Sequence, residues 1–250
     1  MNIDTMSVED AVYYAKLAEQ AERYEDMVTY MGRVVKKEGE LTLEERNLLS
    51  VAYKNTIGLR RTAWRMVSAI EKKEKYAQFR EVTAEYKQKI VGELNDISKE
   101  VLKHIDEDLV PRAEKDQTRV FYLKMKGDYY RYLSEVSGED TLPEVSKGAL
   151  NAYEEACGIA NEKLEATHPI RLGLALNYSV FHYEVMNDHS KACELAKKAF
   201  DDGLQKLDEL QDEDYKDSQT ILQLLKDNLS LWQSSEEEEG GDDTNVQDIS

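Results

Sequence analysis

Cysteine, proline and glycine are scarce in this 250-residue chain, and each scarcity excludes a kind of structure. The two cysteines, Cys157 and Cys193, are too few for a disulfide framework and cannot supply a four-ligand zinc site by themselves. With only three prolines (Pro111, Pro143 and Pro169) and twelve glycines, long stretches contain no helix breaker. The sequence therefore predicts long, uninterrupted helices.

Long hydrophobic runs are also absent. No stretch approaches the roughly 18 apolar residues of a membrane-spanning helix. The first twelve residues contain Asp4, Glu9 and Asp10 and lack the apolar segment of a signal peptide. We expect no membrane insertion and a reducing compartment, which is the cytoplasm, with the nucleus as an additional location.

Basic residues are fewer than acidic ones. The chain has 33 Lys and Arg against 51 Asp and Glu, and its formal net charge is −18. Such a balance argues against broad binding to nucleic acid or anionic membrane, because both are polyanions. We expect no nucleic-acid partner.

Apolar residues recur with a helical period almost throughout. The clearest stripe is Ile90, Leu94, Ile97, Val101, Ile105 and Leu109. Thr42 and Glu45 form a capping box that opens a helix, and Pro169 stands at a first helical turn after a capping residue. No segment has a sustained period of two, so the predicted fold class is all-α. The predicted helices span about 7–21, 23–37, 42–70, 76–109, 116–135, 144–163, 169–186, 189–206 and 214–233.

The composition changes abruptly after residue 233. Residues 234–250 contain four Glu, three Asp and no Lys or Arg. Such a segment cannot bury enough apolar surface to order itself. We predict one helical domain over 1–233 and a disordered acidic tail over 234–250, which either solvates the protein or imitates a ligand of its basic residues.

The sequence offers no catalytic constellation. It has no Gly-rich nucleotide loop, no His-Glu-x-x-His and no Gly-x-Ser-x-Gly. His104, His168 and His182 are scattered. His189 and Cys193 are four residues apart and could share a metal, but a third ligand is missing. We expect no enzymatic activity, no metal and no cofactor.

The scarce basic residues fall into two groups at helical spacing. Lys54, Arg61 and Arg65 share one face of the 42–70 helix. Lys124 and Arg131 are seven residues apart on the next-but-one helix, and Tyr132 follows directly. Arginine, lysine and a phenol are the groups of a phosphate pocket. The alternative is that each stripe is a solvated helix face with internal Asp/Lys pairs.

Two helices carry an amide on an apolar side. Asn228 lies among Ile221, Leu224, Leu225, Leu231 and Trp232, and Asn177 lies beside Leu176, Val180 and Glu184. An amide on an apolar face costs stability unless it is hydrogen-bonded. Its partner is either internal or the main chain of an extended ligand.

Several long segments resemble the 14-3-3 proteins. They are KLAEQAERYEDM at 16–27, RNLLSVAYKNTIGLRRTAWR at 46–65, VFYLKMKGDYYRYL at 120–133, GLALNYSVFHYE at 173–184 and YKDSQTILQLLKDNLSLW at 215–232. The resemblance covers roughly residues 7–233 in consistent order.

This resemblance implies a fold and a function. It implies nine antiparallel helices in a cup-shaped protomer with an amphipathic groove, and a dimer formed through the N-terminal helices. Residues 7–109 would provide dimerisation and the groove floor, and residues 116–233 the groove wall. The implied function is that of a non-catalytic adaptor that binds phosphoserine or phosphothreonine motifs of client proteins. It would regulate these clients by masking, clamping or bridging them.

The resemblance also implies roles for individual residues. Lys54, Arg61, Arg131 and Tyr132 would bind the phosphate, with Arg65 and Lys124 as secondary contacts at the rim. Asn177, Asn228, Glu184 and Trp232 would hold the peptide backbone, and Leu176, Val180, Ile221 and Leu224 would form the apolar wall.

A dimer interface follows from the same resemblance. It would join Leu17 and Ala21 to Val67, Ile70 and Tyr86, with the cross-protomer ion pairs Arg23–Glu93 and Asp26–Lys89. The partner is a second copy of the chain or, alternatively, a sibling isoform. The charge pairs could equally be exposed pairs worth about 0–1 kcal/mol. The rival to the adaptor is a helical scaffold that binds partners without needing a phosphate.

Overall fold

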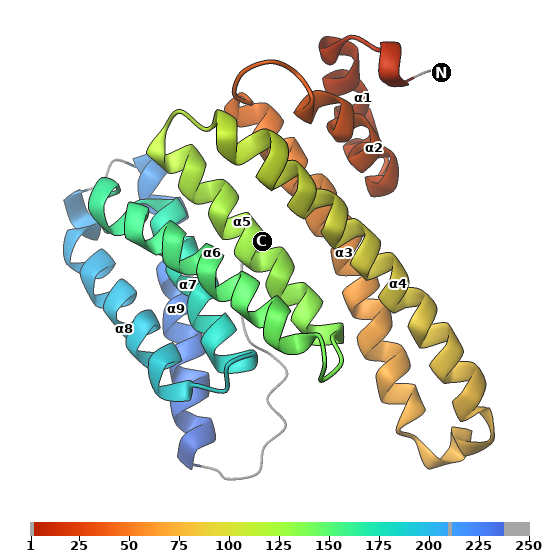
Figure 1. Ribbon diagram of the computed structural model, residues 1–250. Coiled ribbons are helices and arrows are strands. Elements are labelled where there is room, and N and C mark those ends of the chain that lie inside the picture. Colours follow the sequence, from red (N-terminus) through yellow and green to blue (C-terminus); the bar gives the residue numbers. More distant parts are fainter. Residues whose placement is uncertain (1–2, 210–211, 238–250) are drawn as a thin grey trace. The chain divides into compact units, whose positions relative to one another are not determined.

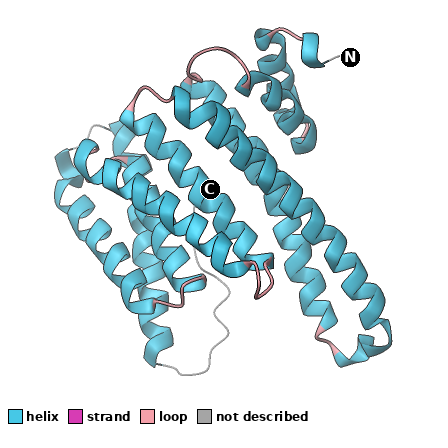
Figure 2. Ribbon diagram, viewed as in Figure 1, coloured by secondary structure: helices cyan, strands magenta, loops and turns pink. Residues whose placement is uncertain are grey.

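The computed structural model describes residues 3–209 and 212–237, and within these residues it contains nine α-helices and no strand (Figures 1 and 2). The all-α prediction is confirmed, and each predicted helix corresponds to one observed helix. Their bounds are α1 Val8–Gln20, α2 Tyr24–Val35, α3 Leu43–Glu71, α4 Arg80–His104, α5 Asp116–Val136, α6 Leu142–Lys163, α7 Pro169–Glu184, α8 His189–Lys206 and α9 Asp212–Glu237.

The predicted 76–109 helix is divided into three in the structure. A 3₁₀ helix, η2 (Glu74–Phe79), precedes α4, and a π-helical turn, η3 (Ile105–Leu109), follows it. The amide of Val110 bonds back to the carbonyl of Ile105, one residue further than in an α-helix. Pro111 lies immediately beyond and has no N–H to donate, so the regular ladder cannot continue through it.

The last helix is longer than predicted. α9 continues to Glu237, so the first four residues of the expected disordered tail are helical. The prediction of disorder placed the boundary at the composition change, but Glu is a good helix former and extends a helix already begun. Residues 238–250 lie outside the described residues.

Helix starts follow the local chemistry of the sequence. Thr42 accepts from the amide of Glu45 at 3.2 Å, and the Glu45 carboxylate accepts from the amide of Thr42 at 2.7 Å, which confirms the capping box. Pro169 opens α7, and the cap itself is His168, whose Nδ1 accepts from the amide of Ile170 at 3.1 Å. These caps fix where α3 and α7 begin and so the register of the residues discussed below.

The chain divides into two compact units, Met1–Arg112 and Ala113–Ser250. In the first unit α1 packs on α2, and α3 and α4 run side by side as a long pair (Figure 1). In the second unit α5 pairs with α6, α7 pairs with α8, and α9 packs against both α7 and α8.

Each unit buries the apolar stripes that the sequence predicts. Along α4 and η3, Ile90, Leu94, Val101, Ile105 and Leu109 are buried. The second unit has a core cluster built from α7, α8 and α9 around the fully buried Trp232. Across the described residues, the structure contains no helix with the length and apolar character needed to traverse a lipid bilayer.

Candidate functional site: a buried polar cluster on α5 and α7

The basic stripe of the first unit lies on α3 as the spacing predicts. Lys54 and Arg65 are exposed, and Arg61 is half-buried. Tyr53 and Ile57, on the side of the helix that adjoins this stripe, are buried in the core. The first unit thus presents three cations along one helix face.

A fourth basic residue of α3, Arg60, was not singled out by the sequence patterns. Its Nε donates to Glu93 at 3.2 Å, and its terminal nitrogen also pairs with Glu25. Arg60 therefore ties α3 to α2 and α4. Its partners are far away in the sequence, so spacing alone could not reveal this role.

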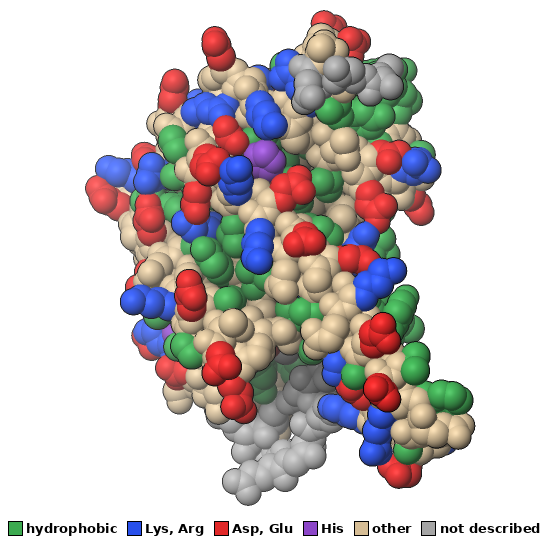
Figure 3. Space-filling model, turned by 45° about the vertical axis from the view of Figure 1, so that its right-hand side comes forward, with side chains coloured by type: hydrophobic (Ala, Val, Ile, Leu, Met, Phe, Trp, Pro, Cys, Tyr) green, Lys and Arg blue, Asp and Glu red, His purple; other side chains and the backbone are tan. Residues whose placement is uncertain are grey.

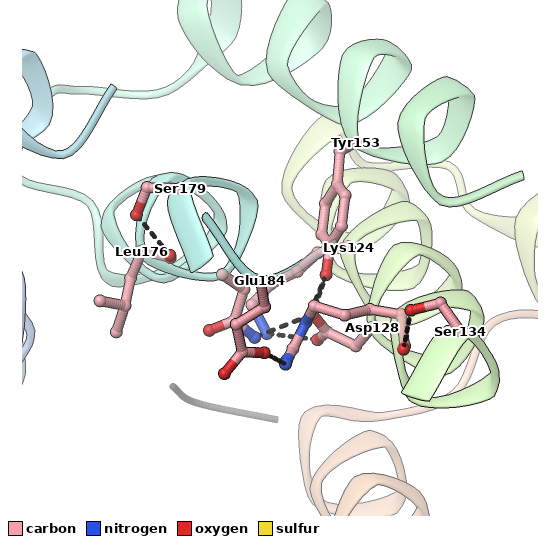
Figure 4. A network of polar contacts seen from close by, with 9 residues as sticks. Lys124, Asp128, Ser134, Tyr153, Leu176, Ser179 and Glu184 are labelled. Atoms are coloured by element: carbon pink, nitrogen blue, oxygen red, sulfur yellow. Dashed lines mark hydrogen bonds and ion pairs between the residues drawn. The ribbon is translucent and has the colours of Figure 1, made fainter. Parts of the chain in front are cut away.

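In the second unit a single buried carboxylate organises the polar side chains. Asp128 of α5 is 1 % exposed. One of its oxygens accepts from the Tyr153 hydroxyl at 2.6 Å and from the Asn177 amide at 2.8 Å. The other accepts from the Lys124 ammonium at 2.8 Å. Asp128 thereby joins α5, α6 and α7 in one network (Figure 4).

Arg131 lies one turn beyond Asp128 and is fully buried. Its guanidinium nitrogens are 3.7 Å from a Glu184 oxygen and 3.9 Å from an Asp128 oxygen, both longer than an ordinary hydrogen bond. The guanidinium carbon also lies 4.8 Å from the centroid of the Tyr132 ring, within cation–π range. Figure 4 shows Lys124, Asp128 and Glu184 directed toward one another between α5 and α7.

Tyr153 is held as a neutral phenol. Burial raises the pKa of its hydroxyl well above the ordinary value, and the negative charge of Asp128 raises it further. The hydroxyl donates to Asp128 and receives a long bond of 3.4 Å from Arg131 Nε. Tyr153 thus fixes the carboxylate and the guanidinium relative to each other.

The cluster has a balanced charge. Lys124 and Arg131 supply two positive charges, and Asp128 and Glu184 supply two negative ones. Such a cluster can orient an arginine and an amide very firmly, because buried charges are costly to leave without partners. Its guanidinium and ammonium groups are of the kind that bind an anion by charge-assisted hydrogen bonds.

The predicted apolar wall belongs to one packed cluster. Leu176, Val180 and Ile221 are buried in the same core as Trp232, and Leu224 is half-buried against it. The Trp232 ring stacks on Tyr183 at 4.8 Å.

Two predicted polar contacts share this region. Asn228 is fully buried on α9, and the indole nitrogen of Trp232 is buried with no acceptor among the described residues.

The expected interface residues lie in the first unit. Leu17, Ala21, Ile70, Tyr86 and Lys89 are exposed, and Val67 and Glu93 are half-buried. Within one chain, Arg23 pairs with Asp26 at 2.5 Å and Glu93 pairs with Arg60. The pairing of these residues across two protomers stays a prediction.

The sequence missed the organising residues of the cluster. Asp128 was visible only as a carboxylate four residues after Lys124, a spacing typical of an ordinary helix pair. Tyr153 gave no signal, because it reaches the cluster from a different helix. Among the described residues, no group of three or more potential ligands could hold a metal ion.

Comparison with known proteins identifies relatives over nearly the whole chain. The family model "14-3-3 protein" matches residues 14–233. "14-3-3-like protein 1" of Caenorhabditis elegans is 55% identical over 229 residues, covering 91% of this chain and 92% of that protein. Human "14-3-3 protein beta/alpha" is 52% identical over 95% of this chain and 97% of its own length. "Protein BMH2" of Saccharomyces cerevisiae is 54% identical over 94% of this chain and 88% of its own length.

Proposed function

This chain belongs to the 14-3-3 family, and we propose that it is an adaptor that binds phosphoserine- or phosphothreonine-containing segments of client proteins. Family membership supports the adaptor role. The observation that carries the finer proposal is the buried Asp128 network, which holds Arg131 and Asn177 in fixed orientations. Occupancy of the site, rather than a chemical reaction, would then mask, clamp or bridge a client.

Charge balance indicates which residues a phosphate requires. A phosphoester carries about −1.5 to −2 charges at neutral pH. The cations of the second unit are already matched by carboxylates, so a bound phosphate needs additional positive charge. The family resemblance assigns that role to Lys54 and Arg61, with the Tyr132 hydroxyl as a further donor. Arg65 and Lys124 are assigned to the rim.

The remaining residues of the second unit suit an extended peptide. Asn177 and Asn228 carry amides that can pair with a peptide main chain, and Glu184 supports them from the end of α7. The indole N–H of Trp232 lacks an acceptor among the described residues, and a ligand carbonyl would supply one. We assign the apolar contacts to Leu176, Val180, Ile221 and Leu224.

The experiment compares phosphorylated and unphosphorylated forms of one fluorescent Arg-x-x-phosphoSer-x-Pro peptide. We expect wild type to bind only the phosphorylated form. Lys54→Glu should weaken that binding at least about tenfold, because it replaces an attraction by a repulsion at the phosphate. The matched control is Lys103→Glu, an exposed lysine of α4 that pairs with Glu107. Equal binding of both peptides would favour the constitutive scaffold instead.

We also propose that the protein acts as a dimer joined through α1 and the α3–α4 pair. Among the residues whose burial the structure describes, the large exposed apolar side chains lie in the first unit, except for Met186 and Leu204. Figure 3 shows one face of the molecule, on which hydrophobic side chains lie among acidic and basic ones. Two linked sites would raise the avidity for doubly phosphorylated clients by about 10²–10⁴ where the spacing fits. We propose the cytoplasm as its location, with the nucleus as an additional one.

A further inference from the structure

A cavity in the second unit is lined by residues of α6, α7 and α8. It has a volume of about 90 Å³. Its apolar lining comes from Ala160, Leu172, Ala175, Leu195 and Ala199. None of the residues proposed above for phosphopeptide binding lines it. It is smaller than the engineered cavity of about 150 Å³ that holds benzene, so it suits an aliphatic tail of a few carbons.

Arg171 lines this cavity and places a positive charge beside it. Arg171 is half-buried and lies in the first turn of α7, where the helix dipole already favours negative charge. One of its nitrogens donates to the carbonyl of Leu164 at 2.7 Å. No carboxylate among the described residues pairs with it. A half-buried guanidinium in a chain with a net charge of −18 thus retains capacity for an anion.

The rim of the cavity adds further polar groups. Lys198 of α8 is exposed and makes no ion pair with any carboxylate that the structure describes, and the Asn161 amide lies on the α6 side. Asp202 also lines the cavity and opposes an anion. With Arg171 and Lys198 against Asp202, the lining still carries one net positive charge.

We propose that this cavity binds a short-chain aliphatic carboxylate. Its hydrocarbon tail occupies the apolar interior, and its carboxylate accepts hydrogen bonds from Arg171 and Lys198. The charged head selects against alcohols and amines of the same length, since neither offers a negative charge to the two cations. This site is separate from the phosphopeptide site and does not depend on it.

A cysteine in the cavity can report whether the cavity is occupied. Cys157 lines it, and burial raises the pKa of this thiol to about 12, which keeps it protonated and slow to react at neutral pH. Cys193 is also half-buried but does not line the cavity. An occupant of the cavity should therefore slow alkylation of one cysteine and not the other.

The experiment measures iodoacetamide modification of both cysteines in the full chain by peptide mass spectrometry. Hexanoate is added up to about 10 mM, and hexanol and hexylammonium serve as length-matched probes. We expect hexanoate to slow modification of Cys157 severalfold and to leave Cys193 unchanged. Hexanol and hexylammonium should protect far less. Added phosphopeptide should not reverse the protection.

Four variants test whether the cations and the volume of the cavity determine protection by hexanoate. Lys198→Gln should weaken hexanoate protection about two- to fivefold, and Arg171→Gln about tenfold. Lys197→Gln, whose lysine pairs with Asp201 outside the cavity, should leave it unchanged. Ala199→Leu should fill the cavity and abolish protection. Equal protection by hexanol, no protection by hexanoate, or full protection in Lys198→Gln would overturn the proposal.

Discussion

Asp128 shows how one buried residue can determine the geometry of several others. Its two oxygens accept from Lys124, Tyr153 and Asn177, which come from three helices. A neutral amide in its place would lose the charge that balances Lys124 and Arg131. It would also present a donor where the network needs an acceptor.

We therefore expect Asp128→Asn to lower the free energy of unfolding by about 2–4 kcal/mol. Urea denaturation followed by circular dichroism measures the loss. The control is Asp201→Asn, which removes the partly exposed partner of Lys197 and should change stability by no more than about 0.5 kcal/mol. A comparable loss of unfolding free energy in both variants would show that the buried network stabilises the protein no more than a surface ion pair does.

Sequence reasoning at this scale grouped the residues of the cluster that share one helix and missed their partners on other helices. Lys124, Arg131 and Tyr132 follow one another at helical spacing, so the chain itself exposes their relation. Tyr153 and Arg60 act through partners from other helices. Contacts of that kind depend on tertiary packing, which no local period encodes.

The packing of α5 on α6 leaves no room for a side chain at Gly127. A Cβ placed on Gly127 would lie 2.6–2.8 Å from the ring carbons of Tyr153. That ring cannot move aside easily, because its hydroxyl is held by Asp128 in a fully buried position. On α6, Gly158 faces open space instead.

A glycine-to-alanine substitution should therefore change the stability in opposite directions at Gly127 and Gly158. Gly127→Ala should destabilise the protein by about 1–3 kcal/mol through overpacking, despite the better helix propensity of alanine. Gly158→Ala should stabilise it by about 0.5–1 kcal/mol, because only the propensity term remains. Denaturation midpoints measure both. A stabilising Gly127→Ala would contradict the close packing described here.

The cap of α3 makes a contribution that depends on pH. Burial alone would raise the pKa of Glu45, but hydrogen bonds from Lys37 and from the Thr42 amide outweigh it, so that the pKa lies below its ordinary value. A depressed carboxyl pKa adds stability above the unfolded value near 4.5, and this stability is lost as the pH falls through the folded value.

Glu45→Gln should thus cost about 1 kcal/mol at pH 7 and progressively less as the pH falls below about 4.5. Unfolding curves at several pH values measure this convergence. Glu44→Gln is the control, since Glu44 is exposed and pairs with Lys16 at the surface. A Glu45→Gln deficit that stays constant down to acid pH would show that the charge of the carboxylate is not what stabilises the cap.

At the scale of elements the sequence was informative wherever the chemistry is local. The capping box, the proline at the start of α7 and the apolar stripe of α4 were all predicted and confirmed. The errors lie where a helix ends. The π turn before Pro111 and the extension of α9 to Glu237 depend on free-energy differences of about a few tenths to a few kcal/mol per residue between helical and other conformations. The spacing of apolar residues carries no information on differences of that size.

At the scale of the whole molecule, exposed apolar side chains concentrate in the first unit. Leu17 is 47% exposed, and Tyr86 is 57% exposed. In a symmetric dimer each such residue is buried twice, and burying one leucine contributes about 1.5–3 kcal/mol. Self-association is the explanation that we propose for this surface.

Leu17→Asp should accordingly raise the dimer dissociation constant by at least about 100-fold. Sedimentation equilibrium measures it, with 28.8 kDa as the protomer mass. Met186→Asp is the control, because Met186 is a similarly exposed apolar residue of the second unit. A wild-type protein that remains monomeric at micromolar concentration would contradict the dimer.

The proposed function depends on recognition of the phosphate itself. The most direct measurement is phosphorus NMR of a phosphoserine peptide titrated with the protein across pH 5–8. Donation from guanidinium, ammonium and phenol groups favours the dianion. We therefore predict a saturable shift of the phosphorus signal at one peptide per chain and a second phosphate pKa displaced below about 6. A phosphorus signal that keeps its free-peptide shift and pKa while the peptide is bound would contradict the proposed function.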